Sequence, residues 1–235
     1  MFELGVTLLY QGKHKEAEGV LLQAIETERS IAEIWFNLGW ALHGQCRYTE
    51  AEEAYSKAIA IDPENERALI GLGVALLYQE RYEEAARACG SALDIAPLNH
   101  DALSTFASAS EELEEYEQIQ RAFSEALQVN AESAFAWDGL AQALFSQNKW
   151  IQSEEAFEEL TKLNPKEPSS WANLGLSREF QGKWTEVEKA YSIAVTLAPR
   201  DPELWNRLGA SMDRQNEWLQ AEKAFLKATQ LNPSE

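Results

Sequence analysis

The sequence predicts an all-α solenoid, built from tandem helix-turn-helix repeats. Three observations predict this fold class. A large residue followed by a small one recurs every 34 residues, seven times, with no insertion or deletion. Aromatic residues, alanines and prolines recur at the same interval in columns of their own. Within each copy, the apolar residues keep the i, i+3, i+7 spacing of one helical face. A fixed period in this range is the signature of stacked supersecondary units.

The columns divide the whole chain into seven copies within a single domain, 1–235. The large–small pair recurs at Leu4-Gly5, Leu38-Gly39, Leu72-Gly73, Phe106-Ala107, Leu140-Ala141, Leu174-Gly175 and Leu208-Gly209. Nine residues after the small one come His14, Tyr48, Tyr82, Tyr116, Trp150, Trp184 and Trp218. Proline recurs at Pro63, Pro97, Pro165, Pro199 and Pro233. The approximate repeats are 1–31, 32–65, 66–99, 100–133, 134–167, 168–201 and 202–235.

One copy, 32–65, shows why the columns exist. Its first helix carries Trp35, Leu38 and Leu42 on one face, and a second helix is expected over 48–61. A glycine such as Gly39 costs a helix about 1 kcal/mol relative to alanine. We therefore expect the second helix to approach Gly39 too closely for a side chain. A single hairpin cannot bury its own apolar face, so neighbouring hairpins must stack.

Local signals set the helix ends. Pro63 stops the second helix of its copy, because proline lacks the N–H and clashes with the preceding turn. Asp201-Pro202-Glu203 supplies an N-cap, a first-turn proline and an acidic residue that suits the helix dipole.

These columns resemble the tetratricopeptide repeat, W-x2-L-G-x2-Y…A-x3-F…A…P, over the whole chain. The best copies are Trp35-Phe36-Asn37-Leu38-Gly39 and Trp171-Ala172-Asn173-Leu174-Gly175. The resemblance implies a right-handed superhelix whose first helices line the inside. It also implies a groove that binds a protein or peptide.

Composition narrows the partners. The chain has 39 acidic and 20 basic side chains, for a formal charge of −19. That charge opposes nucleic acid, whose binding depends on Lys and Arg, and it disfavours anionic membrane surfaces. It either favours a partner with basic residues or simply keeps the protein soluble. No apolar stretch approaches the roughly 20 residues of a membrane-spanning helix.

No catalytic, cofactor or metal motif emerges. Gly71-Leu72-Gly73 lies inside an expected helix without the context of a dinucleotide site. His14, His43 and His100 are scattered, and Cys46 and Cys89 share no metal spacing with them. We therefore expect no enzyme activity, no cofactor and no metal. The two cysteines and the lack of a secretory signal favour a reducing, cytoplasmic compartment.

The candidate partner-binding residues follow from the resemblance, which places first-helix positions facing away from the hairpin partner in the groove. They are Phe2, Val6, Tyr10, Phe36, Asn37, Trp40, His43, Ile70, Val74, Leu77, Tyr78, Phe145, Asn173 and Phe180. In the first three copies they form an apolar, aromatic stripe. The stripe is either a binding surface or packs against neighbouring first helices. Asn37 and Asn173 match the family's groove asparagine, which holds an extended peptide backbone.

Two irregularities add alternatives. The fourth copy has Ala107, Ile119 and Ala131 in place of glycine, alanine and proline, and carries the acidic run 111–117. It is either a solvated helix end or a bendable joint with an acidic contact patch. The first copy starts inside its first helix, and the last lacks a polar cap. We expect an excised piece of a longer protein, or ends covered by a partner.

Three functions remain open. The first is a scaffold or adaptor that receives an apolar peptide or helical segment flanked by Lys or Arg. The second is the regulatory or substrate-presenting arm of a larger enzyme. The third is self-association through the uncapped ends.

Overall fold

The computed structural model describes residues 1–232, and within that range the chain forms fourteen α-helices and no strand. The first helices of the repeats are α1 (Phe2–Tyr10), α3 (Ala32–His43), α5 (Glu66–Leu77), α7 (His100–Glu112), α9 (Ala134–Ser146), α11 (Pro168–Glu179) and α13 (Pro202–Arg214). The second helices are α2 (His14–Thr27), α4 (Tyr48–Ile61), α6 (Tyr82–Ile95), α8 (Tyr116–Val129), α10 (Trp150–Leu163), α12 (Trp184–Leu197) and α14 (Trp218–Leu231). The expected helix 48–61 is α4. Pro233 lies outside the described residues.

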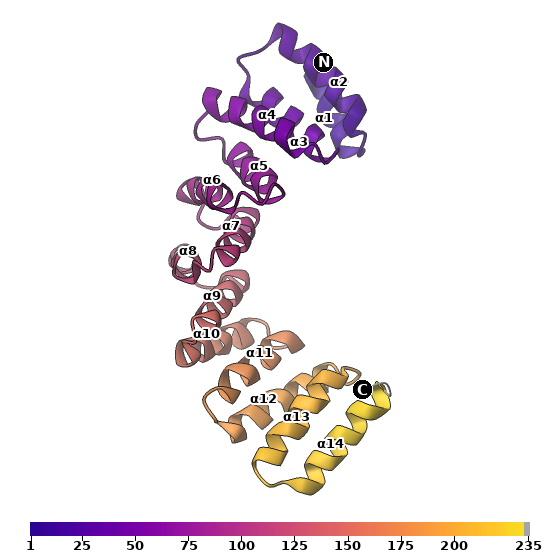
Figure 1. Cartoon of the computed structure of the whole chain (residues 1–235), viewed down its shortest axis with the longest axis vertical. Helices are drawn as coiled ribbons and strands as arrows, with labels where there is room; N and C mark the ends of the chain where they lie inside the picture. Colours follow the sequence, from indigo (N-terminus) through magenta and orange to yellow (C-terminus); the bar gives the residue numbers. More distant parts are fainter. Residues whose placement is uncertain (233–235) are drawn as a thin grey trace. The chain divides into compact units, whose positions relative to one another are not determined.

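The chain forms two compact units. Unit 1 is Met1–Val129, with α1 to α8, and unit 2 begins at Asn130, with α9 to α14. Within each unit, consecutive helices pack against each other as antiparallel hairpins, and each hairpin packs on the next (Figure 1). The all-α repeat solenoid is thereby confirmed. No helix among residues 1–232 has both the length and the apolar character needed to cross a bilayer.

The close approach expected at Gly39 is present. A Cβ atom on Gly39 would lie 2.6 Å from Cε1 of Tyr55, and one on Gly71 would lie at the same distance from that atom. The Tyr55 ring of α4 therefore fills the space between α3 and α5, the first helices of two successive repeats. The N-cap expected at Asp201 is also present, since its side chain accepts from the backbone N–H groups of Glu203 and Leu204.

Each hairpin turns through one residue with positive φ. The residues in this column are Gly12, Cys46, Glu80, Glu114, Asn148, Gly182 and Asn216, with φ between 57° and 72°. The left-handed region is open to glycine and tolerated by asparagine, but it strains other L-residues. Cys46, Glu80 and Glu114 therefore hold strain that Gly12 and Gly182 do not.

Replacing Glu80 by glycine is expected to stabilise unit 1 by roughly 0.5–1 kcal/mol, because it removes this strain. The reciprocal change, Gly182→Ala in unit 2, should destabilise by a similar amount, although a Cβ there meets no atom within 4 Å. Urea unfolding of both variants measures the two effects. Loss of stability in Glu80→Gly would contradict the assignment of strain to this turn.

Tryptophans of four first helices hydrogen-bond the loop that precedes the helix. The indole N–H donates to the carbonyl oxygen six residues earlier in four repeats, from Trp35 to Arg29, Trp137 to Ala131, Trp171 to Pro165 and Trp205 to Pro199, over 2.8–3.0 Å. The aromatic column at the first residue of the second helices has a different environment at the end of the array. Trp218 of this column is 61 % exposed on α14, because no helix of the described residues covers it.

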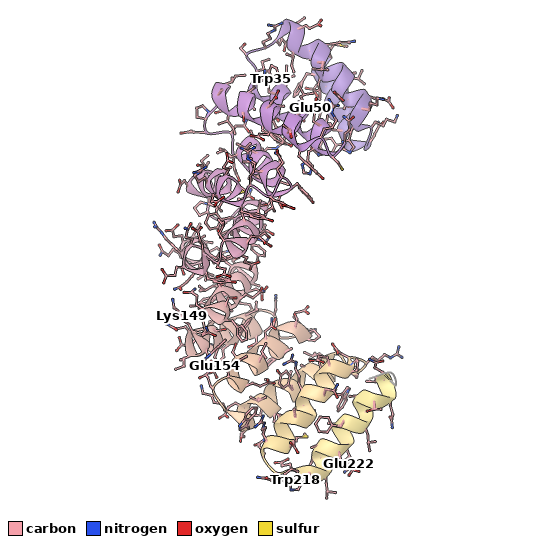
Figure 2. All side chains as sticks on the ribbon, in the orientation of Figure 1. Trp35, Glu50, Lys149, Glu154, Trp218 and Glu222 are labelled. Carbon is pink, nitrogen blue, oxygen red and sulfur yellow. The ribbon has the colours of Figure 1, made fainter. Side chains whose placement is uncertain are left out.

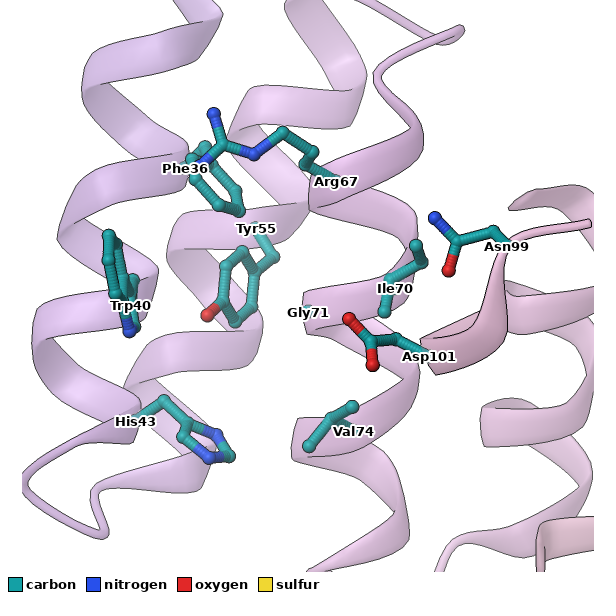
Figure 3. Close-up of a pocket in the computed structure, with 10 residues that line it drawn as sticks. All are labelled: Phe36, Trp40, His43, Tyr55, Arg67, Ile70, Gly71, Val74, Asn99 and Asp101. Atoms are coloured by element: carbon teal, nitrogen blue, oxygen red, sulfur yellow. The ribbon is translucent and has the colours of Figure 1, made fainter. Parts of the chain in front are cut away.

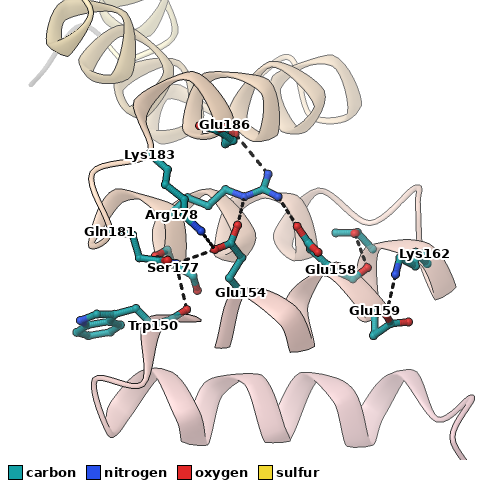
Figure 4. Close-up of polar contacts among 11 residues, drawn as sticks. Trp150, Glu154, Glu158, Glu159, Lys162, Ser177, Arg178, Gln181, Lys183 and Glu186 are labelled. Carbon is teal, nitrogen blue, oxygen red and sulfur yellow. Dashed lines mark hydrogen bonds and ion pairs between the residues drawn. The ribbon is translucent and has the colours of Figure 1, made fainter. Parts of the chain in front are cut away.

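A polar ladder joins successive repeats. A glutamine in the hairpin turn donates Nε2 to a glutamate of the preceding repeat's second helix, in the pairs Gln45–Glu18, Gln79–Glu52, Gln181–Glu154 and Gln215–Glu188, over 2.7–3.0 Å. Two residues after the glutamine, Arg47, Arg81 or Lys183 binds the same glutamate. Figure 4 shows the pair centred on Glu154.

The ladder is interrupted where the third repeat meets the fourth. Ala86 stands in the glutamate column, while Leu113 and Glu115 stand in the glutamine and basic columns. The fourth hairpin, α7 and α8, also packs less closely than the other six. The irregularity seen in the fourth copy thus corresponds to looser packing within the fourth hairpin itself, whereas α7 still packs closely on α6.

Candidate functional site

A hollow of about 340 Å³ opens on the first helices of unit 1. Residues of α3, α4, α5 and the start of α7 line it (Figure 3). The lining residues are Phe36, Trp40 and His43 of α3, Tyr55 of α4, Arg67, Ile70, Gly71 and Val74 of α5, and Asn99 and Asp101 at the start of α7.

Tyr55 forms the floor. Gly39 and Gly71 have no side chains to cover the ring, and the hydroxyl points toward the side of Trp40 and His43 (Figure 3). Burial raises the pKa of Tyr55, so the hydroxyl stays neutral. No protein group within residues 1–232 hydrogen-bonds it. The floor can therefore offer a hydroxyl to a bound group.

The rim holds one cation and one anion. Arg67 lies over the Phe36 ring, 4.2 Å from its centroid, and pairs with Glu33 at 2.8 Å, so its charge is already matched. Asp101 is different: it is exposed, points toward the hollow and makes no ion pair with a described residue (Figure 3). The unmatched charge at the rim is therefore negative.

Aromatic side chains extend the hollow along α3 and α5. Trp40 packs edge-on against Tyr10, with ring centroids 5.4 Å apart. His43 lies edge-on to Tyr48 and Tyr78, which stack at 4.7 Å. Burial lowers the pKa of His43, and His14 lowers it further, so the imidazole is neutral at pH 7. The wall is apolar and aromatic, without a positive charge from His43.

Unit 2 has a smaller hollow of about 250 Å³. Phe145 and Asn173 line it together with Gln142 and Leu176. Beside it, Phe180 stacks on Trp150 at 4.3 Å, and Phe145 lies edge-on to both rings. This cluster repeats the His43–Tyr48–Tyr78 arrangement three repeats later.

Among the described residues no three His, Cys, Asp or Glu side chains are grouped to hold a metal ion. Burial raises the pKa of the Cys89 thiol to about 12, against a smaller opposite effect of a hydrogen bond with Thr105. A thiol with that pKa is a poor nucleophile at neutral pH. What both hollows offer is shape, apolar surface and hydrogen-bonding groups.

Sequence comparison with protein families agrees with this architecture. Models described as tetratricopeptide repeat match residues 2–66, 139–202 and 172–235, and a second such model matches 42–103. The chain belongs to the tetratricopeptide repeat family. Proteins of this family generally mediate protein–protein interactions. Among curated proteins, none matches the sequence.

Solved tetratricopeptide repeat (TPR) structures share the fold. The C-terminal part of a TPR protein from Cytophaga hutchinsonii is 12 % identical with a TM-score of 0.82, over 100 % of this chain and 96 % of that one. A TPR protein from Parabacteroides merdae is 21 % identical with a TM-score of 0.65, over 100 % and 93 %. YrrB, "a TPR protein with an unusual peptide-binding site", is 20 % identical with a TM-score of 0.63, over 76 % and 92 %. At these identities the likeness shows the fold.

The structure brings some of the expected groove residues together. Phe36, Trp40, His43, Ile70 and Val74 line the unit 1 hollow, and Tyr10 and Tyr78 flank it. Phe36 is buried and Tyr78 is 60 % exposed. The other expected residues lie outside this hollow. Phe2 packs against the core of the first two repeats, Val6 is half-buried on α1, and Leu77 packs against the core that includes Leu76 and Phe106. Phe145, Asn173 and Phe180 belong to unit 2.

Asn37 needs a correction. Its side chain is only 2 % exposed, and Nδ2 donates to the carbonyl oxygen of Glu33 at 2.6 Å. The amide is thus engaged within α3 and is absent from the lining of the hollow, in contrast to the expected contact with a peptide backbone. Asn173, half-buried, does line the hollow of unit 2.

Sequence reasoning missed Tyr55, Arg67, Asn99 and Asp101. Tyr55 lies in a column that reads as hairpin core, and its role at the floor follows from the two glycines beside it. Arg67 and Asp101 lie 34 residues apart in the first turn of successive first helices. That shared position was the available signal.

Proposed function

We propose that this chain is an interaction scaffold, and that the unit 1 hollow binds an apolar segment of a partner protein with a Lys or Arg beside the apolar residue. The observation that supports this proposal is the apolar, aromatic wall of the hollow together with Asp101 at its rim, which forms no ion pair with a described residue. YrrB, with its peptide-binding site, supports the use of this fold for such a task.

The wall selects an apolar side chain because burial of apolar area contributes about 25 cal/mol per Å². Trp40, Ile70 and Val74 supply that area. The neutral Tyr55 hydroxyl and the Trp40 indole N–H can donate to a carbonyl oxygen of the bound segment. Asp101 favours a Lys or Arg next to the apolar side chain that enters the hollow. The net charge of −19 attracts a basic partner over a longer range.

The test is selection from a random peptide library on the whole chain, followed by binding measurements on the selected peptides. We expect an apolar anchor with Lys or Arg nearby. Trp40→Ala should weaken binding at least tenfold because an aromatic wall is lost. Asp101→Asn should weaken it about threefold, less so at high salt, because a rim charge acts through a screened interaction.

Ile151→Ala is the matched control, since it removes an exposed apolar side chain from unit 2 at a position outside both hollows. It should leave the affinity unchanged. Circular dichroism of each variant verifies that the helices are intact. Peptides that bind Trp40→Ala as tightly as the parent chain would remove the proposed site.

A further inference from the structure

The polar ladder between repeats has end groups at both ends of the array that find no partner among residues 1–232. Where two successive repeats meet, the hairpin turn of the second repeat supplies a glutamine and, two residues later, a basic side chain. The second helix of the preceding repeat supplies the glutamate that binds both. The Gln45–Arg47–Glu18 and Gln181–Lys183–Glu154 sets are examples, with bonds of 2.6–2.8 Å.

The first hairpin turn presents the donors of such a junction. Gln11 and Lys13 occupy the glutamine and basic columns, both are exposed, and neither has a partner among residues 1–232. Leu4 on α1 is 51 % exposed, whereas Leu38, Leu174 and Leu208 in the same column are at most 4 % exposed. The face formed by Leu4, Gln11 and Lys13 is therefore the kind that other repeats cover with a preceding hairpin.

The last hairpin presents the acceptor. Glu222 on α14 occupies the glutamate column and is exposed, and Trp218 lies one turn before it (Figure 2). Phe225 is 38 % exposed, whereas its six counterparts are at most 4 % exposed. Together with Leu226 and Thr229 these residues line a hollow of about 370 Å³. This is the face of a second helix on which a following first helix sits, as α13 sits on α12.

We propose that the α14 face of one copy receives the first hairpin of a second copy, so that chains associate head to tail. The occupant is a second copy because the same chain carries both halves: Gln11 and Lys13 match Glu222 in type and spacing, and Leu4 matches the apolar hollow around Phe225. The two faces differ from each other, so the contact is heterologous and generates an open series of chains unless the rotation closes a ring. This contact is independent of the unit 1 hollow.

The Lys13 and Glu222 charges set the head-to-tail direction of association, and the net charge of the chain makes association depend on ionic strength. Lys13 attracts Glu222 only when the first hairpin of one copy meets the last hairpin of another. The net charge of −19 on every copy opposes association at low ionic strength. At 0.15–0.3 M salt the screening length falls to about 8 Å or less. Short contacts then persist, while the longer-range repulsion is reduced.

The experiment is sedimentation equilibrium of the whole chain from micromolar to about 100 µM at 0.2 M salt. We expect the average mass to rise with concentration beyond that of a dimer. Glu222→Lys and Lys13→Glu should each lower the association constant at least tenfold. An equimolar mixture of these two variants should regain it, since each then offers a charge opposite to that of its neighbour.

The mixture also separates loss of contact from loss of folding, because misfolded variants cannot restore each other. Glu155→Lys, the same change at an exposed position of α10, is the matched control and should associate like the parent chain. A constant monomer mass over the whole range would overturn the proposal. So would association that Glu222→Lys leaves unchanged, because another surface would then be in contact.

Discussion

Replacing Trp171 by alanine is expected to lower the free energy of unfolding of unit 2 by about 3 kcal/mol. The Trp171 ring packs against two core clusters, one around Phe157 and Leu174 and one around Tyr191 and Leu208. Truncating a buried tryptophan costs about 3–5 kcal/mol. The ring is half-buried, which places the expected loss at the lower end of that range.

Two variants separate the contributions of Trp171. Trp171→Phe keeps most of the ring but removes the N–H that donates to Pro165 at 3.0 Å, so a loss of about 1 kcal/mol is expected. Trp218→Ala removes the same side chain from an exposed position and should cost less than about 1 kcal/mol. Urea unfolding gives the three values on one scale.

Hydrogen exchange locates the effect. Contacts in a repeat protein join neighbours, so protection should fall in α9 to α14 and persist in α1 to α6. An equal loss of protection in every helix of Trp171→Ala would mean that the whole chain unfolds as one cooperative unit, contrary to nearest-neighbour stability.

The fold was predictable because the same helix-packing pattern recurs in every repeat. One pattern combines a small residue at Gly39, a large ring at Tyr55 that packs against it, and a helix stop at Pro63. Because seven copies align, the irregularities of any one copy do not hide this pattern. The start of α3, α5, α7, α9, α11 and α13 follows the expected repeat boundaries for this reason. Local chemistry then fixed the ends, as the Asp201 cap illustrates.

The candidate site was predictable only in part. The family resemblance places the outward-facing positions of α3 and α5 in the groove, and Trp40 and Val74 at these positions line the hollow. The floor and the rim depend on how far one helix sits from another. Tyr55 reaches the hollow because Gly71 of the next repeat leaves space, and Asp101 reaches it from α7. Asn37 was misplaced because spacing does not reveal that its amide turns back to Glu33.

The polar ladder shows the same limit. Its glutamine, basic and glutamate columns are visible in the sequence, but each one alone reads as solvated turn or helix surface. They become a joint only when the turn of one repeat is placed against the second helix of the repeat before it. The pairing of Gln181 with Glu154 spans 27 residues, a separation that no helical period suggests.

Replacing Glu154 by alanine should lower the free energy of unfolding of unit 2 by about 2–3 kcal/mol. Glu154 is buried and accepts hydrogen bonds from Arg178, Gln181 and Lys183 (Figure 4). Removing one partner of a buried ion pair costs about 3–5 kcal/mol, because the remaining charge loses its compensation. Arg178 keeps Glu158 at 2.6 Å, which moderates the loss.

The same carboxylate should make unit 2 sensitive to acid. Burial alone would raise the pKa of Glu154, but the hydrogen bonds from Lys183, Arg178 and Gln181 outweigh it and hold the pKa below the ordinary value of 4.5. A depressed pKa in the folded state means that the unfolded state binds protons first as pH falls. The stabilisation is complete above about pH 5 and is lost as the pH drops through the folded-state value.

Urea unfolding between pH 7 and pH 3 measures both effects. The parent chain should lose stability below pH 5 more steeply than Glu154→Gln, which keeps the shape of the side chain but has no proton to bind. Glu155→Gln, one residue away and exposed, is the control and should follow the parent chain. Parallel pH profiles for the parent and Glu154→Gln would show that the joint between the fifth and sixth repeats is held by packing alone, without the charge at its centre.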